Sequence, residues 1–236
     1  PLWSRGLGDV YKRQAGIPGE DAEDVTVAVD FLREVNSGKI DTLSGRTIVV
    51  GGGNVAIDVA RNACRLGSEH VEMFCLESEA QMPASEEERR EAVEDGAHIS
   101  CGWGPKEVLT NEVGAVRGIV FKRCTHVFGD DGRFAPEYDE NDLVTIECDQ
   151  VVFAIGQSIE WGNLLEGSAV ELGRSQGAVA DPQTYQTAEP DIFVGGDVYT
   201  GPSFAIDAIA AGHEAAVSIH RFVQPGSTLT LSLIHI

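Results

Sequence analysis

The sequence feature that most constrains the fold is a run of three glycines, Gly51–Gly53, between a strand pattern and a helix pattern. Before it, Thr47–Val50 is a short β-branched run of the kind found in buried parallel strands. After it, Asn54–Leu66 places apolar residues on one helical stripe, and Val71–Leu76 predicts a second strand. Strand, glycine turn, helix and strand fill the length of one βαβ unit. We therefore predict an α/β fold with a parallel sheet.

The glycine turn also matches the dinucleotide-binding pattern G-x-G-x-x-A, with Gly51, Gly53 and Ala56 at its fixed positions. Gly51 allows the tight turn, Gly53 lets the backbone approach a diphosphate, and Ala56 lets the helix pack closely on the strand. The diphosphate would accept hydrogen bonds from the N–H groups of Asn54 and Val55 at the positive end of the helix dipole. The alternative is a glycine turn without a ligand in an ordinary βαβ unit.

Glu77 follows the second strand and bears on the choice of nucleotide. A carboxylate there accepts hydrogen bonds from both ribose hydroxyls of NAD and repels the 2′-phosphate of NADP, which an NADP site would bind with Arg. The stretch Phe74–Glu79 contains no basic residue. We expect NAD(H) as the preferred nucleotide and NADP as the less favoured one. The alternative is that Glu77 only caps the strand and a distant Arg binds the phosphate.

Composition excludes several other classes of protein. With 17 Lys and Arg against 38 Asp and Glu, the formal net charge is -21, which disfavours nucleic acid and anionic membranes as partners. Hydrophobic residues make up 42% of the chain, too many for a disordered acidic tail, yet no apolar run is long enough to span a membrane. The five cysteines form no CxxC pair, which predicts reduced core cysteines, no metal site and a cytoplasmic location.

Other segments complete the predicted order of elements. The patterns predict helices over Asp24–Val35, Glu86–Asp95 and Pro202–Phe222, and strands over Val116–Phe128, Leu143–Phe153 and Asp191–Val194. Together the strands from Lys106 to Phe153 predict an antiparallel meander beside the βαβ unit. The acidic loop 129–142 between them lacks the central Gly and the closing Glu of an EF-hand loop, so we do not expect calcium there.

Six segments carry a resemblance to a known family: GIPGED (Gly16–Asp21), AVDFL (Ala28–Leu32), VVGGGNVAIDVAR (Val49–Arg61), MPAS (Met82–Ser85), VVFAIGQ (Val151–Gln157) and DIFVGGDVYTGPSFAIDAIAAGHEAA (Asp191–Ala216). They occur in the family's order, and the chain resembles the flavoprotein oxidoreductases related to the small (beta) subunit of NADPH-dependent glutamate synthase. That family belongs to the pyridine nucleotide-disulfide oxidoreductase-like class. The resemblance implies a Rossmann-like NAD(P)-binding domain inserted in a partial FAD-binding domain.

The resemblance also implies positions that serve FAD. These are Ala154 and Gly156, where the chain would return to the FAD domain, and Gly196, Asp197, Pro202, Ser203 and Ala205. In the family, an Asp at the position of Asp197 hydrogen-bonds the ribityl chain, and the helix that starts near Pro202 points its N-terminus at the flavin ring. The family commonly has two Arg at the positions of Leu76 and Glu77, so this departure agrees with a preference for NADH.

The two ends of the chain are related through their coding DNA. The reverse complement of one set of codons for Asp9–Gln14 (DVYKRQ) encodes Leu231–Ile236 (LSLIHI), and this inverted repeat resembles the transposase adapter used to build sequencing libraries. We therefore expect residues 1–14 and 231–236 to be adapter-derived. The expected organisation is then 15–42 as the end of a first FAD-domain segment with a linker helix, 43–156 as the NAD(P)-binding domain, and 157–230 as the C-terminal FAD-domain segment.

The resemblance implies an FAD-dependent oxidoreductase in which NADH passes a hydride to FAD. Electrons would leave through an iron-sulfur centre or a partner subunit that these residues do not encode. The hydride step needs no acid–base residue, so we name no catalytic side chain. The family's FAD fingerprint and iron-sulfur region would precede Ala15, so we expect this chain by itself to hold FAD weakly or not at all and to be inactive. Two alternatives stay open: a non-catalytic module that binds NAD, and a pyridine nucleotide-disulfide reductase.

Overall fold

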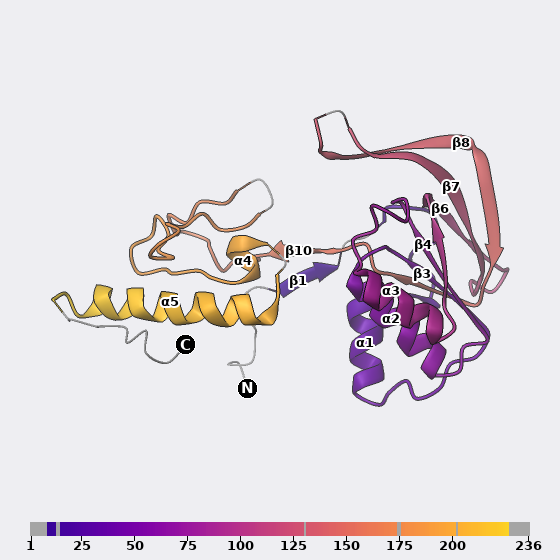
Figure 1. The fold of residues 1–236 in the computed structure, drawn as a ribbon, viewed down its shortest axis with the longest axis horizontal. Coiled ribbons are helices and arrows are strands. Elements are labelled where there is room, and N and C mark those ends of the chain that lie inside the picture. Colours follow the sequence, from indigo (N-terminus) through magenta and orange to yellow (C-terminus); the bar gives the residue numbers. More distant parts are fainter. Residues whose placement is uncertain (1–8, 13–14, 130, 174–175, 202, 227–236) are drawn as a thin grey trace. The chain divides into compact units, whose positions relative to one another are not determined.

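The computed structural model describes residues 9–12, 15–129, 131–173, 176–201 and 203–226. The chain forms two compact units (Figure 1). One unit is Lys12–Gly156 and contains the glycine turn. The other is built from the chain after Gly156 together with the segment before Lys12.

A five-stranded parallel sheet forms the centre of the first unit. Its strands, in spatial order, are β2 (Val25–Val27), β9 (Gln150–Phe153), β3 (Arg46–Val50), β4 (His70–Cys75) and β5 (His98–Cys101). Every neighbouring pair of these strands is parallel. The chain leaves β3 through the glycine turn, forms a helix and returns as β4, so the predicted βαβ unit and the α/β fold are confirmed.

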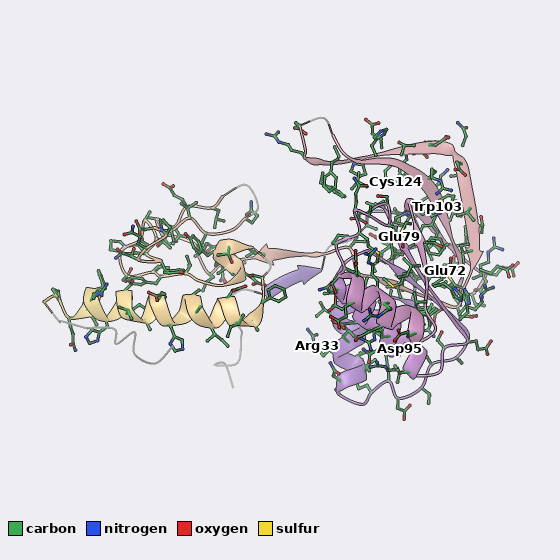
Figure 2. The ribbon with its side chains drawn as sticks, in the orientation of Figure 1. Arg33, Glu72, Glu79, Asp95, Trp103 and Cys124 are labelled. Carbon is green, nitrogen blue, oxygen red and sulfur yellow. The ribbon has the colours of Figure 1, made fainter. Side chains whose placement is uncertain are left out.

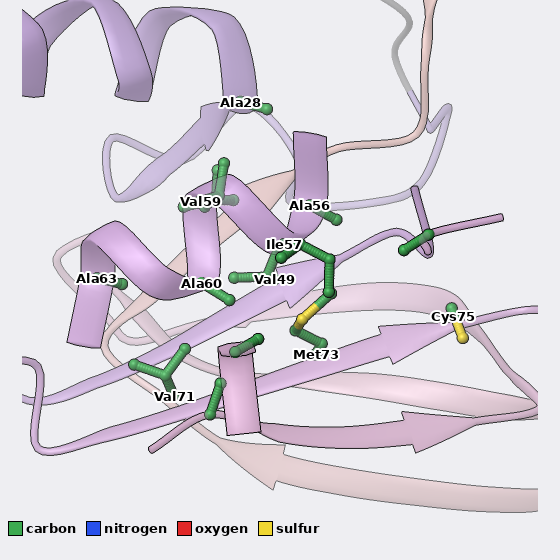
Figure 3. Packing of buried hydrophobic residues seen from close by; sticks show 14 of the residues in the cluster. Ala28, Val49, Ala56, Ile57, Val59, Ala60, Ala63, Val71, Met73 and Cys75 are labelled. Carbon is green, nitrogen blue, oxygen red and sulfur yellow. The ribbon is translucent and has the colours of Figure 1, made fainter. Parts of the chain in front are cut away.

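Three helices pack on one face of this sheet: α1 (Ala28–Asn36), α2 (Asn54–Arg65) and α3 (Glu86–Glu94). Val49 of β3 and Met73 of β4 lie in one buried cluster with Ile57 of α2 (Figure 3). Because successive strand residues point to opposite faces, Ile48 and Val50 face away from the helices. Both faces of β3 are therefore buried, which explains its uninterrupted apolar run.

An antiparallel meander covers the opposite face of the parallel sheet. Its strands, in spatial order, are β6 (Trp103–Thr110), β7 (Val116–Phe128) and β8 (Phe134–Glu147). Phe121 of β7 stacks on Phe74 of β4 with 4.1 Å between the ring centroids. Both rings belong to a second buried cluster that includes Ile48. The predicted meander is present, and it packs directly on the strands that carry the glycine turn.

The helix predicted over Asp24–Val35 is wrong in its first turn. Val25–Val27 forms β2 and pairs residue for residue with Val151–Phe153 of β9, so α1 begins only at Ala28. The three residues of β2 are β-branched, and the edge of the sheet offers them a hydrogen-bonded ladder. The helical spacing of the valines runs across the boundary, which is why the pattern alone did not show it.

Two predictions in the meander also need correction. Most of the predicted acidic loop 129–142 belongs to β8, which begins at Phe134 and pairs with β7. The single strand predicted over Leu143–Phe153 is divided between β8 and β9, and these strands lie in different sheets. At the division, Asp149 Oδ2 accepts a hydrogen bond of 2.8 Å from Arg46 N at the start of β3. The side chains of β8 are mostly exposed, so this strand has little apolar signal.

Among its described residues, the second unit contains one long helix and little sheet. Its elements are the strand pair β1 (Asp9–Lys12) and β10 (Gln157–Glu160), the short helix α4 (Asp197–Thr200) and the long helix α5 (Ala205–Val223). The strand predicted over Asp191–Val194 is wrong, because only Phe193 forms a bridge, to Gln186. The long helix begins at Ala205 rather than at Pro202, which lies outside the described residues. Within the described chain, no helix combines the length and apolar character needed to cross a membrane.

Candidate functional site

Gly51 occupies a place in the glycine turn where no side chain fits. Its φ is 148°, and a Cβ atom there would lie 2.9 Å from the carbonyl carbon of Ala154 and still closer to the carbonyl oxygen. Hydrogen bonds hold both neighbouring strands against the turn, since Gly51 N donates to Phe74 O at 2.8 Å and Ala154 N donates to Val50 O at 2.7 Å. The turn is therefore tight because β9 closes against it.

Gly53 and the first turn of α2 are open, in contrast to Gly51. A Cβ atom on Gly53 would meet no heavy atom within 4 Å. Asn54 and Val55 are exposed, and no described residue accepts a hydrogen bond from their backbone N–H groups. Ala56 is the first residue of the helix whose backbone N–H donates a hydrogen bond within the described chain, to Gly53 O at 2.9 Å. An anion can reach this end of the helix and its positive dipole.

The Glu77 side chain lies against the glycine turn. A Cβ atom on the buried Gly52 would lie 2.9 Å from Glu77 Oε2 and 3.0 Å from Cys75 Cβ. The backbone of Glu77 is fixed from the other side, because its carbonyl oxygen accepts a hydrogen bond of 3.0 Å from Gly102 N at the end of β5. The structure thus brings Glu77 next to the turn, although the two are separated by a complete helix and strand in the sequence.

The MPAS segment (Met82–Ser85) supports the turn, a role that its sequence alone did not predict. Ala84 N donates to Gly52 O at 3.0 Å, and Ser85 N donates to the Asn54 side-chain oxygen at 3.2 Å. Ser85 also caps α3, because its hydroxyl oxygen accepts a hydrogen bond of 3.2 Å from Glu88 N. The signal in the sequence was the Ser85 to Glu88 spacing at the start of a charged helix. This segment fixes the orientation of the Asn54 side chain.

A cavity of about 370 Å³ lies beyond Glu77. It is lined by the segment after β4, the end of β5 and part of β7: Leu76, Ser78, Glu79, Gln81, Cys101, Gly102, Cys124, Thr125, His126, Val127 and Phe128. No Lys or Arg belongs to this lining. Burial raises the pKa of the Cys124 thiol, and the Glu77 carboxylate nearby raises it further. Glu79 and Cys124 mark the region of the cavity in Figure 2.

Two arginines lie close to the cavity lining. Arg89 Nη1 donates to the carbonyl oxygen of Glu79 at 2.7 Å, and Arg123 approaches from the meander. Arg123 Nη1 would be 3.5 Å from a Cβ atom on Gly102. Its guanidinium stacks over the Trp103 ring at 3.6 Å from the ring centre, and its Nε donates to Asp142 Oδ2 at 3.1 Å. Arg123 is therefore held by an aromatic ring and a carboxylate of the meander.

The residues matched to FAD contacts lie mostly in the second unit. Gly196 has φ 70° and ψ −154°, a backbone conformation that favours glycine, and it is followed by the exposed Asp197 at the start of α4. A Cβ atom on Gly195 would lie 3.2 Å from Ala211 Cβ, and one on Gly196 would lie 3.4 Å from Ala208 Cβ. The turn packs closely on α5 and leaves the Asp197 side chain exposed.

The start of α5 carries its own acidic cap. Ser203 Oγ donates to Asp207 Oδ2 at 2.5 Å, and Phe204 N donates to the same oxygen at 3.3 Å. Ser203 and Ala205 are exposed, and Pro202 lies outside the described residues. The carboxylate of Asp207 offsets part of the positive dipole at this helix end.

Two matched positions end the first unit. Ala154 lies under the glycine turn, and Gly156 has φ 97° and is the last residue of that unit. The proposed nucleotide residues Gly51, Gly53, Asn54, Val55 and Glu77 therefore lie together at the carboxyl edge of the parallel sheet, where ligands of open α/β sheets commonly bind.

Comparison with solved structures agrees with this fold. Thioredoxin reductase from T. acidophilum matches with a TM-score of 0.69 at 18% identity, over 89% of this chain and 62% of that chain. FprA from Mycobacterium tuberculosis in complex with NADPH matches with a TM-score of 0.69 at 16% identity, over 92% of this chain and 62% of that chain.

Curated relatives match at higher identity. The NADP(+)-dependent formate dehydrogenase subunit beta of Moorella thermoacetica is 36% identical over 90% of this chain and 30% of its own length. The glutamate synthase (NADPH) small chain of Escherichia coli is 30% identical over 93% of this chain and 50% of its own length. The NAD-dependent dihydropyrimidine dehydrogenase subunit PreT of Escherichia coli is 32% identical over 89% of this chain and 45% of its own length. The chain thus spans half or less of the length of these relatives.

A family model covers most of the chain. The description of that model is pyridine nucleotide-disulphide oxidoreductase, and the match extends over residues 8–212. It includes the glycine turn, the Glu77 strand end and the turn at Gly196. The resemblance found in the sequence is confirmed, and the chain belongs to the pyridine nucleotide-disulphide oxidoreductase family.

Proposed function

We propose that the chain carries the nucleotide-binding part of an FAD-dependent oxidoreductase in which NADH is the hydride donor. The observation that supports this most is the pairing of an open helix end at Gly53 with the Glu77 carboxylate beside the same glycine turn. An anionic diphosphate fits the first feature, and a ribose diol fits the second. Both groups occur in one dinucleotide.

The surroundings of Glu77 favour NADH over NADPH. Glu77 and Glu79 put two carboxylates at the end of β4, and no Lys or Arg lines the adjoining cavity. Arg89 and Arg123 are close, but Arg89 donates to Glu79 O, and Arg123 is held by Asp142 and the Trp103 ring. A 2′-phosphate would have to compete with these partners for either guanidinium. The relatives include proteins named for NADP and for NAD, so this preference is a proposal for this chain alone.

The chain's own residues act by positioning the nucleotide. Gly51 fixes the turn against β9, and Gly53 leaves space for a diphosphate close to the backbone. Asn54 and Val55 would donate their N–H groups to it, while Ser85 holds the Asn54 side chain in place. Holding a donor in one orientation accelerates transfer without an acid or base from the protein.

FAD is the proposed acceptor, and when bound it would supply a flavin ring that takes the hydride at N5. The exposed Asp197 fits a hydrogen bond to the ribityl chain, and Gly196 gives it a turn that packs on α5. The end of α5 marked by Ser203 and Ala205, with Pro202 before it, would face the ring. Because Asp207 caps this end, its attraction for an anionic flavin is weaker than that of an uncapped helix.

In the whole protein we propose that 15–42 ends a first FAD-domain segment, 43–156 binds NAD(H), and 157–230 completes the FAD domain. The apolar side chains of Phe204, just before α5, and of Ile206 and Ile209 in it support this, because they are 76%, 68% and 56% exposed and suit burial against further protein. We propose that the electrons pass to an iron-sulfur centre or a partner subunit, and the relatives that are named as subunits support the partner subunit.

Binding of the two nucleotides tests the proposal. Titrations of the purified chain with NADH and with NADPH, followed by nucleotide fluorescence, are expected to give an NADH affinity at least about tenfold higher. ADP-ribose should displace NADH, since it carries the diphosphate and both riboses. Tighter binding of NADPH would contradict the role of Glu77, and absence of binding of either nucleotide would contradict the site.

A further inference from the structure

Two cysteines that are distant in the sequence lie side by side at the carboxyl edge of the sheet. Cys75 ends β4 and Cys101 ends β5, and the two are direct partners in the parallel register. Their sulfur atoms are 3.7 Å apart, with the Cys75 thiol donating to Cys101 Sγ. Neighbouring strands lie about 4.8 Å apart, which is within the Cα separation that a disulfide bridges.

The two thiols differ in their access to solvent. Cys75 is only 2% exposed and lies beyond Val71 and Met73 along β4 (Figure 3). Burial raises the pKa of its thiol well above the usual range, and the neighbouring Cys101 raises it further. Cys101 is partly exposed and lines the cavity beyond Glu77. A small oxidant can therefore reach Cys101 first, with Cys75 behind it.

We propose that Cys75 and Cys101 form an oxidisable dithiol that hydrogen peroxide converts to a disulfide, and that this modification weakens nucleotide binding. The Cys101 thiolate attacks one peroxide oxygen, the O–O bond breaks, and hydroxide leaves and takes up the thiol proton as water. Cys75 sulfur then attacks Cys101 sulfur and releases a second water. Two thiols lose two electrons and two protons, and one peroxide becomes two waters.

The link to nucleotide binding, which rests on the proposed function, follows from the neighbours of Cys75. The Cys75 thiol also lies 3.6 Å from the carbonyl oxygen of Glu77, which is a second acceptor within its reach. The Cys75 Cβ atom lies under Gly52, since a Cβ atom on Gly52 would be only 3.0 Å from it. Disulfide formation removes the Cys75 S–H, so that thiol can no longer donate to Glu77 O, and closing the sulfurs from 3.7 Å to bonding distance moves atoms under the turn. We expect a decrease in NADH affinity of about tenfold.

Peptide mapping after peroxide treatment tests the dithiol itself. The full chain is treated with hydrogen peroxide, the remaining thiols are alkylated, and peptides are mapped without reduction. We expect a cross-linked peptide pair containing Cys75 and Cys101 that dithiothreitol separates. Cys101→Ala and Cys75→Ala should each abolish it, while Cys64→Ala, which changes a cysteine elsewhere in the same unit, should leave it intact.

Three results would overturn the dithiol: oxidation of Cys101 to the sulfinic acid while Cys75 stays alkylatable, a different cysteine pair in the cross-link, or no oxidation of Cys101. Because Cys75→Ala changes a buried position, its circular dichroism spectrum must match that of the native chain, and Cys101→Ala provides the second variant.

NADH titrations of the reduced and the oxidised chain test the coupling. An equal NADH affinity in both forms would overturn the proposed effect of the disulfide on nucleotide binding, but not the formation of the disulfide itself. Failure of the reduced chain to bind NADH would contradict the proposed function instead, and the peptide map would still decide whether the dithiol forms.

Discussion

Replacing Gly51 with alanine perturbs the turn at its tightest point. The new residue would keep a φ of 148°, which side chains rarely adopt, and its methyl group would collide with the Ala154 carbonyl. The backbone conformation costs about 1–3 kcal/mol, and overpacking against a fixed backbone costs about 1–3 kcal/mol more. We therefore expect Gly51→Ala to lower the free energy of unfolding by about 2–6 kcal/mol, a large part of the total stability of a domain.

Gly53→Ala is the matched control, because Gly53 has a φ of −91° and open space around its missing side chain. We expect a stability change of at most about 1 kcal/mol, together with a fall in NADH affinity of at least about tenfold where the methyl group meets the diphosphate. Urea unfolding curves give the free energies, and NADH titration gives the affinities. A free energy of unfolding for Gly51→Ala within about 0.5 kcal/mol of that of the native chain would refute the tight turn. Normal NADH binding by Gly53→Ala would refute the place of the diphosphate.

Three further substitutions probe other contacts of the same unit. Glu77→Arg should weaken NADH binding about tenfold and strengthen NADPH binding, as measured by paired titrations, and an unchanged NADH affinity would refute the role of Glu77. Asp95 accepts a 2.8 Å hydrogen bond from Arg61 Nε, and this bond lowers the pKa of Asp95 below its usual value. A carboxyl group whose pKa is lower in the folded than in the unfolded state stabilises the protein at pH values above the unfolded pKa. This stabilisation is lost as the pH falls through the folded pKa. Asp95→Asn should therefore flatten the loss of stability between about pH 5 and pH 2, as measured by urea midpoints across that range. Asn54→Ala removes the acceptor for Ser85 N and should lower the free energy of unfolding by about 1 kcal/mol, measured by urea unfolding; no change would show that the bond does not hold the MPAS segment.

The parts of the fold that the sequence predicted well are those that local chemistry determines. The Gly51–Gly53 turn and the helix that follows it need particular residue types at consecutive positions, so a single stretch of sequence contains the whole signal. The helix predicted from Asn54 to Leu66 ends one residue earlier, at Arg65. The strand before the turn is also short, apolar and local.

The parts that were missed depend on partners from elsewhere in the chain. Val25–Val27 is a strand because β9 offers it a ladder, more than a hundred residues later. The exposed strand β8 forms because β7 pairs with it, despite an acidic composition that resembles a loop. Intrinsic preferences are weak enough that such pairing overrides them.

Cys75 and Cys101 show the same limit at the level of the site. Their proximity depends on the register between β4 and β5, and a shift of one residue would place Ser100 or Gly102 opposite Cys75 and turn the side chains to the other face. No spacing between two cysteines 26 residues apart specifies that register. The register is instead set by the packing of both strands beneath the helices, and the carboxyl edge of a parallel sheet then brings strand ends together. The edge that brings Glu77 to the glycine turn thus also brings a thiol pair beneath it, so the proposed nucleotide site and the proposed dithiol share one edge of the sheet.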